Sequence, residues 1–420
     1  ARSLRLVLIC FIGISFCPQR SFPLSLSSPS PPPGASTSPR KKHQQRVKPI
    51  PYVATTSTVE HSRCLTQYLR EGDKVLELGT QLDASSTNIL NAIGSTGHAT
   101  LVDVKRTETK SGRTSQGTRD RDKFLANDGA TNYKFIELEQ FSNWRMVLDA
   151  NQDSPFDVMV LDATAMLGND LELTALSVIS EFVDDCLRRN HRPRAVVVKS
   201  KAISSLARRV VHAQRLMDGT VKRNLKSRSR DGRPYIVTSV GVEEYRRTIP
   251  HVVQQGDKIV EVGCFSGVTT ALLHAAASPG GCIGCDIGPK IIERAKKEHP
   301  DMEFFVGDAW KSLDLLRMKS RSNLQGAPGD LDGYDVIYAD IGGLSGPDGT
   351  LESLSLLNGL GYALEPRCVV IKSLCMRRLA SSLRAYSDDW EKETNSLKSQ
   401  ALYYEGIRSS NPNKRNYFLT

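Results

Sequence analysis

The sequence predicts an α/β protein that contains two tandem, doubly wound domains with mostly parallel sheets. Three short segments recur in the same order: GDKVLELG at 72 and GDKIVEVG at 256, FDVMVLDAT at 156 and YDVIYADIG at 334, RAVVVKS at 194 and RCVVIKS at 367. The repeated unit is about 180 residues long, which is too long for a solenoid repeat and suits a whole domain. We therefore expect an ancient duplication of one domain.

Within the second unit, short apolar runs rich in β-branched residues alternate with helical stretches. Near-continuous apolar strands, each followed by an amphipathic helix, are typical of a parallel sheet covered on both faces. The predicted strands are KIVEVG at 258, CIGCDIG at 282, MEFFVG at 302, DVIYADIG at 335 and RCVVIKSL at 367, and the predicted helices are 268–277, 289–300 and 376–386.

The repeat and the composition together place the domain boundaries. We expect a targeting presequence over 1–48, a divergent first domain over 49–239 and a second domain over 240–420. PYVATTS at 51, PYIVTSV at 234 and NYFLT at 416 look alike. If such a strand closes each domain, Tyr235 to Ser239 is the last strand of the first copy. Residues 234 to 240 could instead open the second copy.

The first 48 residues have the composition of a targeting segment. An apolar run of about 12 residues, where a spanning helix needs roughly 20, precedes a Ser- and Pro-rich, basic stretch without Asp or Glu. This pattern resembles the bipartite leaders of algae with complex plastids, and secretion is the alternative. We expect no stable membrane association once the leader is removed.

Charge and cysteine content limit the possible partners. The leader carries eight Lys or Arg, most of the formal net charge of +10, so global basicity does not indicate nucleic acid. Locally, 199–233 holds eleven Lys or Arg and two Asp. This segment would supply phosphate contacts if the protein binds RNA, and a solvated loop is the alternative. Cys282 and Cys285 form a CxxC without a second pair, so we expect core thiols and no metal site.

The segment VEVGCFSG at 260 has the features of a ligand-binding turn between a strand and a helix. Gly263 can adopt the positive φ of a tight turn, and Gly267 would leave room for a ligand near the backbone. Asp286 ends the next strand, where a carboxylate can accept hydrogen bonds from ribose hydroxyls. Asp308 ends the third strand. Neither GxGxxG nor a phosphate-binding GK[ST] loop is present.

These motifs, E-x-G-C-x-x-G, D-I-G, G-D-A and Y-D-V-I-Y-A-D, resemble the class I, Rossmann-like S-adenosylmethionine-dependent methyltransferases over essentially all of 240–420. The resemblance implies S-adenosyl-L-methionine as the cofactor. The cofactor-binding positions that it implies are Glu261, Gly263, Cys264, Phe265, Ser266, Gly267, Asp286, Ile287, Asp308, Ala309 and Asp340.

Two of these strand ends carry candidate catalytic residues. Asp340 follows the fourth strand and Lys372 the fifth, so both should lie at the carboxyl edge of the sheet. The pair resembles part of the Lys-Asp-Lys-Glu set of the FtsJ-like 2′-O-ribose RNA methyltransferases. Only two of those four positions match, because Arg246 or Arg247 stands where the first Lys is expected and the Glu has no counterpart. Lys372 would act as a base, or would simply neutralise Asp340.

The first copy keeps much of this pattern but not the glycine turn. Asp83 stands at the position of Gly267, which should hinder the carboxylate end of the cofactor through steric and like-charge repulsion. We therefore expect one cofactor site, in the second copy. The retained positions are Glu77, Gly79, Asp103, Glu139, Asp162 and Lys199.

The sequence thus supports three functions. The first is methylation of an RNA ribose hydroxyl by the second copy, and the second is methylation of a small molecule or protein. The third is a non-catalytic RNA-binding or assembly module with a vestigial cofactor fold. The methyl acceptor and the oligomeric state do not follow from the sequence.

Overall fold

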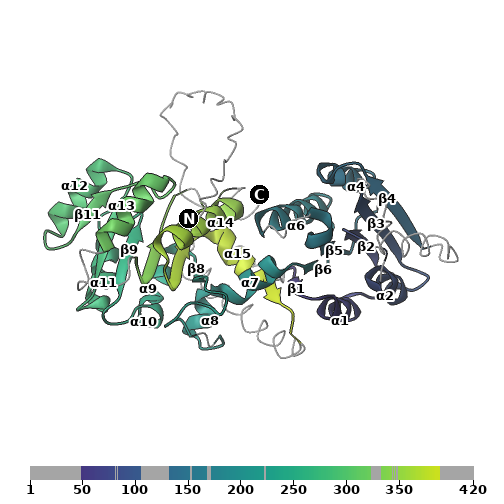
Figure 1. Cartoon of the computed structure of the whole chain (residues 1–420), viewed down its shortest axis with the longest axis horizontal. Helices are drawn as coiled ribbons and strands as arrows, with labels where there is room; N and C mark the ends of the chain where they lie inside the picture. Colours follow the sequence, from purple (N-terminus) through teal and green to yellow (C-terminus); the bar gives the residue numbers. More distant parts are fainter. Residues whose placement is uncertain are drawn as a thin grey trace, which may run out of the picture. The chain divides into compact units, whose positions relative to one another are not determined.

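A computed structural model confirms the α/β class, with two seven-stranded sheets whose paired strands all run parallel (Figure 1). Among the described residues, no helix is long and apolar enough to cross a membrane. The predicted presequence over 1–48, residues 106–131 and NYFLT at 416 lie outside the described residues. Described are 49–80, 82, 84–105, 132–151, 154–167, 172–221, 224–322, 333–342, 344, 346 and 349–387.

The first sheet has the strand order β14-β1-β6-β5-β2-β3-β4. Its strands are β1 Tyr52–Thr55, β2 Lys74–Leu78, β3 His98–Val104, β4 Tyr133–Leu138, β5 Val158–Asp162, β6 Ala195–Lys199 and β14 Leu383–Ala385. The helices of this half are α1 Thr58–Tyr68, α2 Ala84–Ile93, the 3-10 helix η1 Phe141–Trp144, α4 Arg145–Asp149, α5 Ala163–Leu167, α6 Glu172–Arg188 and α7 Lys201–Arg209.

The second sheet has the corresponding order β11-β10-β9-β12-β13-β8-β7. Its strands are β7 Val210–His212, β8 Tyr235–Ser239, β9 Lys258–Val262, β10 Gly281–Asp286, β11 Phe304–Val306, β12 Val336–Ala339 and β13 Cys368–Lys372. The helices are α8 Ala213–Met217, α9 Gly241–Arg247, α10 Ile249–Val252, α11 Val268–Ala277, α12 Pro289–Glu298, α13 Ser312–Ser322, α14 Gly349–Leu364 and α15 Leu374–Ser382.

The central strands form the core of each half because they are buried on both faces. Every residue of β5 and of β12 is buried, as expected for apolar runs in a parallel sheet with helices on both sides. Cys282 and Cys285 are buried thiols on β10, which confirms their prediction as core residues. The five strands predicted for the second copy are β9 to β13, and all five are confirmed.

Two predictions at the domain ends are wrong. Tyr235–Ser239 does not close the first copy: it pairs with β13, from Cys368 to Lys372, in the second sheet. It therefore opens the second copy, which was the alternative for residues 234 to 240, just as Tyr52–Thr55 opens the first by pairing with β6. The helix predicted over 376–386 ends at Ser382, because the next residues pair with β1 and this tertiary contact outweighs local helix propensity.

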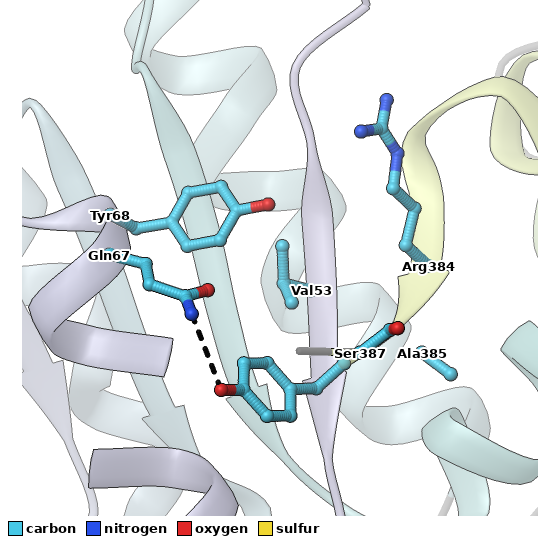
Figure 2. A pocket seen from close by; sticks show the side chains of 7 residues that line it. Val53, Gln67, Tyr68, Arg384, Ala385 and Ser387 are labelled. Atoms are coloured by element: carbon cyan, nitrogen blue, oxygen red, sulfur yellow. Dashed lines mark hydrogen bonds between the residues drawn. The ribbon is translucent and has the colours of Figure 1, made fainter. Parts of the chain in front are cut away.

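The edge strand beside each opening strand comes from the other half of the chain. The pairing of β7 with β8 matches Val211 with Val237, and the pairing of β14 with β1 matches Arg384 with Val53. After β14, the Tyr386 amide donates to the Ala54 carbonyl at 2.8 Å. The Tyr386 hydroxyl accepts from Gln67 Nε2 at 3.4 Å (Figure 2).

An ion pair is repeated at the amino ends of the strands in both halves, opposite the carboxyl edge. Arg367 donates to Asp257 at 2.5 Å and to the Val252 carbonyl at 3.2 Å, and the Asp257 carboxylate also accepts from the Gln254 amide. In the first half, Arg194 makes the matching contacts with Asp73 and with a backbone carbonyl. The pair holds the segment before β9 against the segment before β13 in the second half. In the first half it holds the segment before β2 against the segment before β6.

Replacing Arg367 with Ala should destabilise the second half by about 3 to 5 kcal/mol, because it leaves Asp257 buried without its cation. The Arg194→Ala variant is the matched control and should cost less, since the Arg194 side chain is 25% exposed and that of Arg367 is 9% exposed. Denaturant unfolding of both variants measures the difference. Equal losses would contradict a buried role for Arg367.

Candidate functional site

The two predicted catalytic residues lie side by side at the carboxyl edge of the second sheet. Strands β12 and β13 pair with Ala339 opposite Ile371, so the next residues of each strand, Asp340 and Lys372, are neighbours. Lys372 Nζ donates to the Asp340 carboxylate, and both side chains are partly exposed. The pair is therefore formed and also accessible from solvent.

Gly263 brings the turn after β9 against this pair. Its φ is 80°, and a Cβ built on it would stand 2.1 Å from the carbonyl oxygen of Asp340. No other residue fits there, because both the positive φ and the close backbone contact exclude a side chain. Gly263 therefore lets the end of β9 approach the end of β12.

Gly267 serves packing within the protein, which differs from the prediction. It is the N-cap of α11 with φ 83°, so the predicted positive-φ turn is present. Its missing Cβ would meet Phe304 Cζ at 2.7 Å and His299 Cδ2 at 2.8 Å. The space that glycine leaves free is thus filled by two side chains of the protein, and the expected approach of a ligand at this Cβ is wrong.

Glu261 on β9 is buried and lies beside the Asp340 pair. Thr270 Oγ1, on the first turn of α11, donates to Glu261 Oε2 at 2.5 Å. Burial raises the pKa of Glu261 to about 8; the hydrogen bond from Thr270 opposes this, and Asp340 adds to it. The carboxyl is therefore mostly protonated at pH 7.

Arg246 supplies a positive charge on the other side of Glu261. Its Nε donates to Thr269 Oγ1 at 2.9 Å, and its charge lowers the pKa of Glu261, against the larger effect of burial. Arg246 was a candidate for the first Lys of the FtsJ-like set. The structure brings it to the first turn of α11, where its guanidinium can bind an anionic group.

Asp286 is held at the end of β10 with room for further hydrogen bonds. Its Oδ2 accepts from the Phe265 amide at 3.2 Å and its Oδ1 from the Gly288 amide at 3.0 Å. A carboxylate has about four acceptor positions, so each oxygen can still accept from a hydroxyl. The neighbouring side chains of Phe265 and Ile287 are 60% and 65% exposed.

The third strand end continues this surface. Asp308 Oδ1 accepts from the Trp310 amide at 3.0 Å, and Asp308 Oδ2 lies 3.5 Å from Lys311 Nζ. The indole of Trp310 is about half exposed, whereas Ala309 is buried. Exposed apolar side chains thus follow β9, β10 and β11 in turn, next to carboxylates that can accept from hydroxyl or amino groups.

The remaining predicted positions shape the turn itself. Cys264 is buried, and burial raises the pKa of its thiol, so it is a packing residue and not a nucleophile. Phe265 has φ 48° and an exposed ring, and Arg294 Cζ lies 6.0 Å from the ring centroid. Ser266 is half-buried between Phe265 and Gly267. These residues fit a cofactor that contacts the backbone and ring surface of the turn.

The first copy repeats the acid-base pair without the same turn. Lys199 Nζ donates to Asp162 Oδ2 at 2.8 Å. The two residues are opposite each other at the ends of β5 and β6, as Asp340 and Lys372 are at the ends of β12 and β13. Asp83 lies outside the described residues, but its neighbour Leu82 is buried with φ 50° in the core under the turn. Glu139 is exposed and pairs with Lys105 at 3.0 Å. A buried apolar side chain therefore anchors this turn at the position of Ser266, which is half-buried in the second copy.

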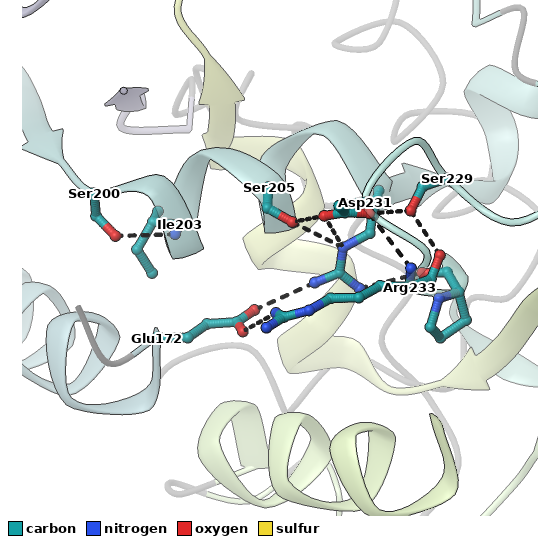
Figure 3. A network of polar contacts seen from close by, with 9 residues as sticks. Glu172, Ser200, Ile203, Ser205, Ser229, Asp231 and Arg233 are labelled. Carbon is teal, nitrogen blue, oxygen red and sulfur yellow. Dashed lines mark hydrogen bonds and ion pairs between the residues drawn. The ribbon is translucent and has the colours of Figure 1, made fainter. Parts of the chain in front are cut away.

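Part of the basic segment 199–233 is used within the protein. Arg209 is buried, with Nη2 3.7 Å from Glu172 Oε1 and Nε 3.8 Å from Asp231 Oδ2. Arg233 also pairs with Glu172, at 3.4 Å (Figure 3). The segment therefore offers fewer free cations than its composition suggests. Exposed bases that remain in its described part include Arg208, Lys226 and Arg230.

Sequence reasoning missed the support beneath the site. Thr270 and Thr269 hold Glu261 and Arg246, and the only signal was a pair of threonines at the start of a helix. Tyr245 is buried edge-on against Tyr338, with ring centroids 5.1 Å apart. Within the described ranges, no group of three His, Cys, Asp or Glu residues could hold a metal ion.

No protein-family model matches the sequence. A TehB-like SAM-dependent methyltransferase from Corynebacterium glutamicum is 19% identical over 34% of this chain and 80% of its own, at TM-score 0.23. A SAM-dependent methyltransferase from Thiobacillus denitrificans, in complex with S-adenosyl-L-homocysteine, is 17% identical over 31% and 48%, at TM-score 0.21. DesVI of Streptomyces venezuelae is 16% identical over 30% and 45%, at TM-score 0.21. The matched part of this chain spans less than half the length of each of the latter two proteins.

The raised pKa of Glu261 predicts a pH-dependent stability. The unfolded chain ionises this carboxyl above about pH 4.5, whereas the folded protein keeps it protonated up to about pH 8. The stability that depends on the protonated Glu261 is therefore fully present below about pH 4.5. It falls as the pH rises above 4.5 and is lost once the pH has passed about 8. Between pH 5 and 8 the native chain should lose roughly 3 kcal/mol more than Glu261→Gln does.

Urea unfolding at pH 5, 6, 7 and 8 measures this difference. Glu243→Gln is the control, because Glu243 is exposed on α9, and it should follow the native chain. Parallel pH profiles for the native chain and Glu261→Gln would contradict a protonated Glu261.

Proposed function

We propose that the second copy is an S-adenosylmethionine-dependent methyltransferase that acts on a ribose 2′-hydroxyl of RNA. The observation that carries the proposal is the Lys372–Asp340 pair, accessible at the carboxyl edge next to the Gly263 turn. Ligands of doubly wound folds bind at this edge. The residues that follow the neighbouring strands suit an adenosyl group, which supports this cofactor.

Each part of that cofactor has candidate partners in the chain. The Asp286 carboxylate keeps acceptor positions for ribose hydroxyls, and Asp308 can accept from an amino group. The exposed side chains of Phe265, Ile287 and Trp310 offer apolar surface to the adenine. The cofactor would supply a sulfonium methyl group, a donor that needs mainly alignment with its acceptor.

The chain itself must remove a proton, because a hydroxyl is a weak nucleophile. In the proposed step, Lys372 as the neutral amine accepts the proton of the acceptor hydroxyl while its oxygen bonds to the methyl carbon. Asp340 then stabilises the ammonium that forms, through the contact already present in the structure. The exposed bases of 199–233 would contribute contacts to RNA phosphates, independent of sequence.

The leader composition makes organellar, in particular plastid, RNA the first acceptor to test. A small molecule or a protein side chain would be the acceptor if RNA is not methylated and another substrate is. A non-catalytic role in RNA binding or assembly would be favoured if calorimetry detects no binding of S-adenosylmethionine to the purified protein.

The Lys372→Ala variant should lower methyl transfer to RNA by about 10²- to 10⁴-fold, the usual contribution of a general base. Its affinity for S-adenosylmethionine should change less than about twofold, because Lys372 is not assigned to cofactor binding. Transfer is measured with a labelled methyl group and affinity by calorimetry. Asp340→Ala should also abolish transfer.

Two further variants separate a base from a structural cation. Lys372→Arg keeps the positive charge beside Asp340 but cannot lose its proton, so it should be as inactive as Lys372→Ala. Lys199→Ala removes the matching lysine of the first copy and should leave transfer unchanged. Activity close to that of the native chain in Lys372→Arg would overturn the assignment of Lys372 as the base.

Calorimetric titration with S-adenosylmethionine should give one site per chain. The turn of the first copy buries Leu82 in its core and lacks the exposed ring of Phe265, so it should not bind the cofactor. Asp286→Ala should weaken the measured site, and Asp103→Ala should not. Two sites of similar affinity would contradict the inactive assignment of the first copy.

A further inference from the structure

The exchange of edge strands between the halves rests on a repeated helix-strand arm. Ser200 caps α7 by accepting from the Ile203 amide, and Ser373 caps α15 by accepting from the Met376 amide. Each helix has nine residues and each following strand has three. The arm is therefore the same element in both copies, and it sends its strand to the other sheet each time.

No residue separates the helix from the strand in either arm. α7 ends at Arg209 and β7 begins at Val210, and α15 ends at Ser382 and β14 begins at Leu383. Val210 and Leu383 are extended, with φ −76° in both cases. A helix that crosses back between parallel strands runs against them, so returning to the same sheet requires a reversal of the chain, normally in a loop of about 2 to 6 residues.

Because this loop is absent, the chain continues into the neighbouring sheet. A segment with a short hinge loop cannot fold back onto its own domain. Such hinges are a known cause of domain swapping, in which identical domains exchange a segment. The packing agrees: α7 lies against β1 and the received β14, and α15 lies against β8 and the received β7. Each helix thus covers one strand of its own copy and one of the other.

The received strands are built into the cores of the sheets that they join. Val211 of β7 is buried in one cluster with Val237 and Tyr338 of the second copy. Tyr386, just after β14, packs against the first-copy cluster that contains Val53 and Val197. Thr238 Oγ1 also donates to the Val211 carbonyl at 3.3 Å.

The strand received by the second sheet lies one strand away from the site. β7 pairs with β8, and β8 pairs with β13, the strand that carries Lys372. The Ser373 amide donates to the Ser239 carbonyl at 3.1 Å, so the end of β8 holds the end of β13. β8 then leads directly into α9, the helix that carries Arg246.

We propose that the two copies form an exchanged pair within one chain, each completed by the edge strand of the other, and that completing the second sheet is a function of the divergent first copy. The first copy is then required even where it binds no cofactor. The exchange also implies that neither half folds fully without the other.

Hydrogen exchange of the full chain tests which sheet each strand supports. Val211→Gly removes the buried side chain of β7, and Leu383→Gly, its matched control, removes that of β14. Val211→Gly should speed amide exchange in Tyr235–Ser239 by at least about tenfold and leave Tyr52–Thr55 unchanged, and Leu383→Gly should do the reverse. If Val211→Gly affects Tyr52–Thr55 as much as Tyr235–Ser239, or more, the proposal is overturned.

A second measurement does not require either variant to fold. A protease site inserted after Gly219, an exposed turn residue, lets the folded chain be cut between β7 and β8. The two fragments should elute together on gel filtration and separate only in denaturant. Two fragments that elute apart, each with native-like far-UV circular dichroism, would overturn the exchange. Neither measurement depends on methyl transfer, so failure of the proposed activity would leave both outcomes unaffected.

Discussion

The parallel alignment of all paired strands is the constraint on which the rest of the structure depends. β5 pairs with β6 and β12 with β13, so that in both sheets an aspartate at the end of one strand meets the lysine at the end of the other. The same alignment gathers the turns after β9, β10 and β11 at one edge, where Asp286 and Asp308 lie. It also requires every connection to cross over the sheet, which is why a missing loop after α7 or α15 has such large consequences.

The two halves share the charged groups of this edge and differ in one turn. Both keep the lysine-carboxylate pair and the buried glutamate with a hydroxyl donor, Glu77 with Ser86 at 2.8 Å and Glu261 with Thr270 at 2.5 Å. They differ in the turn between these groups. In the first copy, Leu82 is buried; in the second, its counterpart Ser266 is half-buried and the preceding Phe265 is exposed, where the first copy has Gln81. The second turn therefore has an exposed aromatic ring that the first turn lacks.

The sequence predicted the features that depend on local pattern. The central strands, the Lys372–Asp340 pair and the buried thiols follow from apolar runs and from the rule that strand ends share an edge. The destination of β7 and β14 could not be predicted, because a three-residue strand has no local signal that names its partner sheet. The role of Gly267 was also missed: the side chains that fill its space, Phe304 and His299, are more than thirty residues away in the chain.

Retention of the Asp162–Lys199 pair in the first copy bears on how the second pair should be understood. An ion pair that persists above a different turn satisfies two groups that the parallel register places together, whatever else the edge does. Proximity alone therefore does not separate a base from a counter-ion in the second copy. What distinguishes the second pair is its setting, since Asp340, Lys372 and Arg246 all act on the buried Glu261 and exposed rings lie at the same edge. A catalytic role thus depends on the surroundings of the pair, and these surroundings include β8, which the strand from the first copy supports.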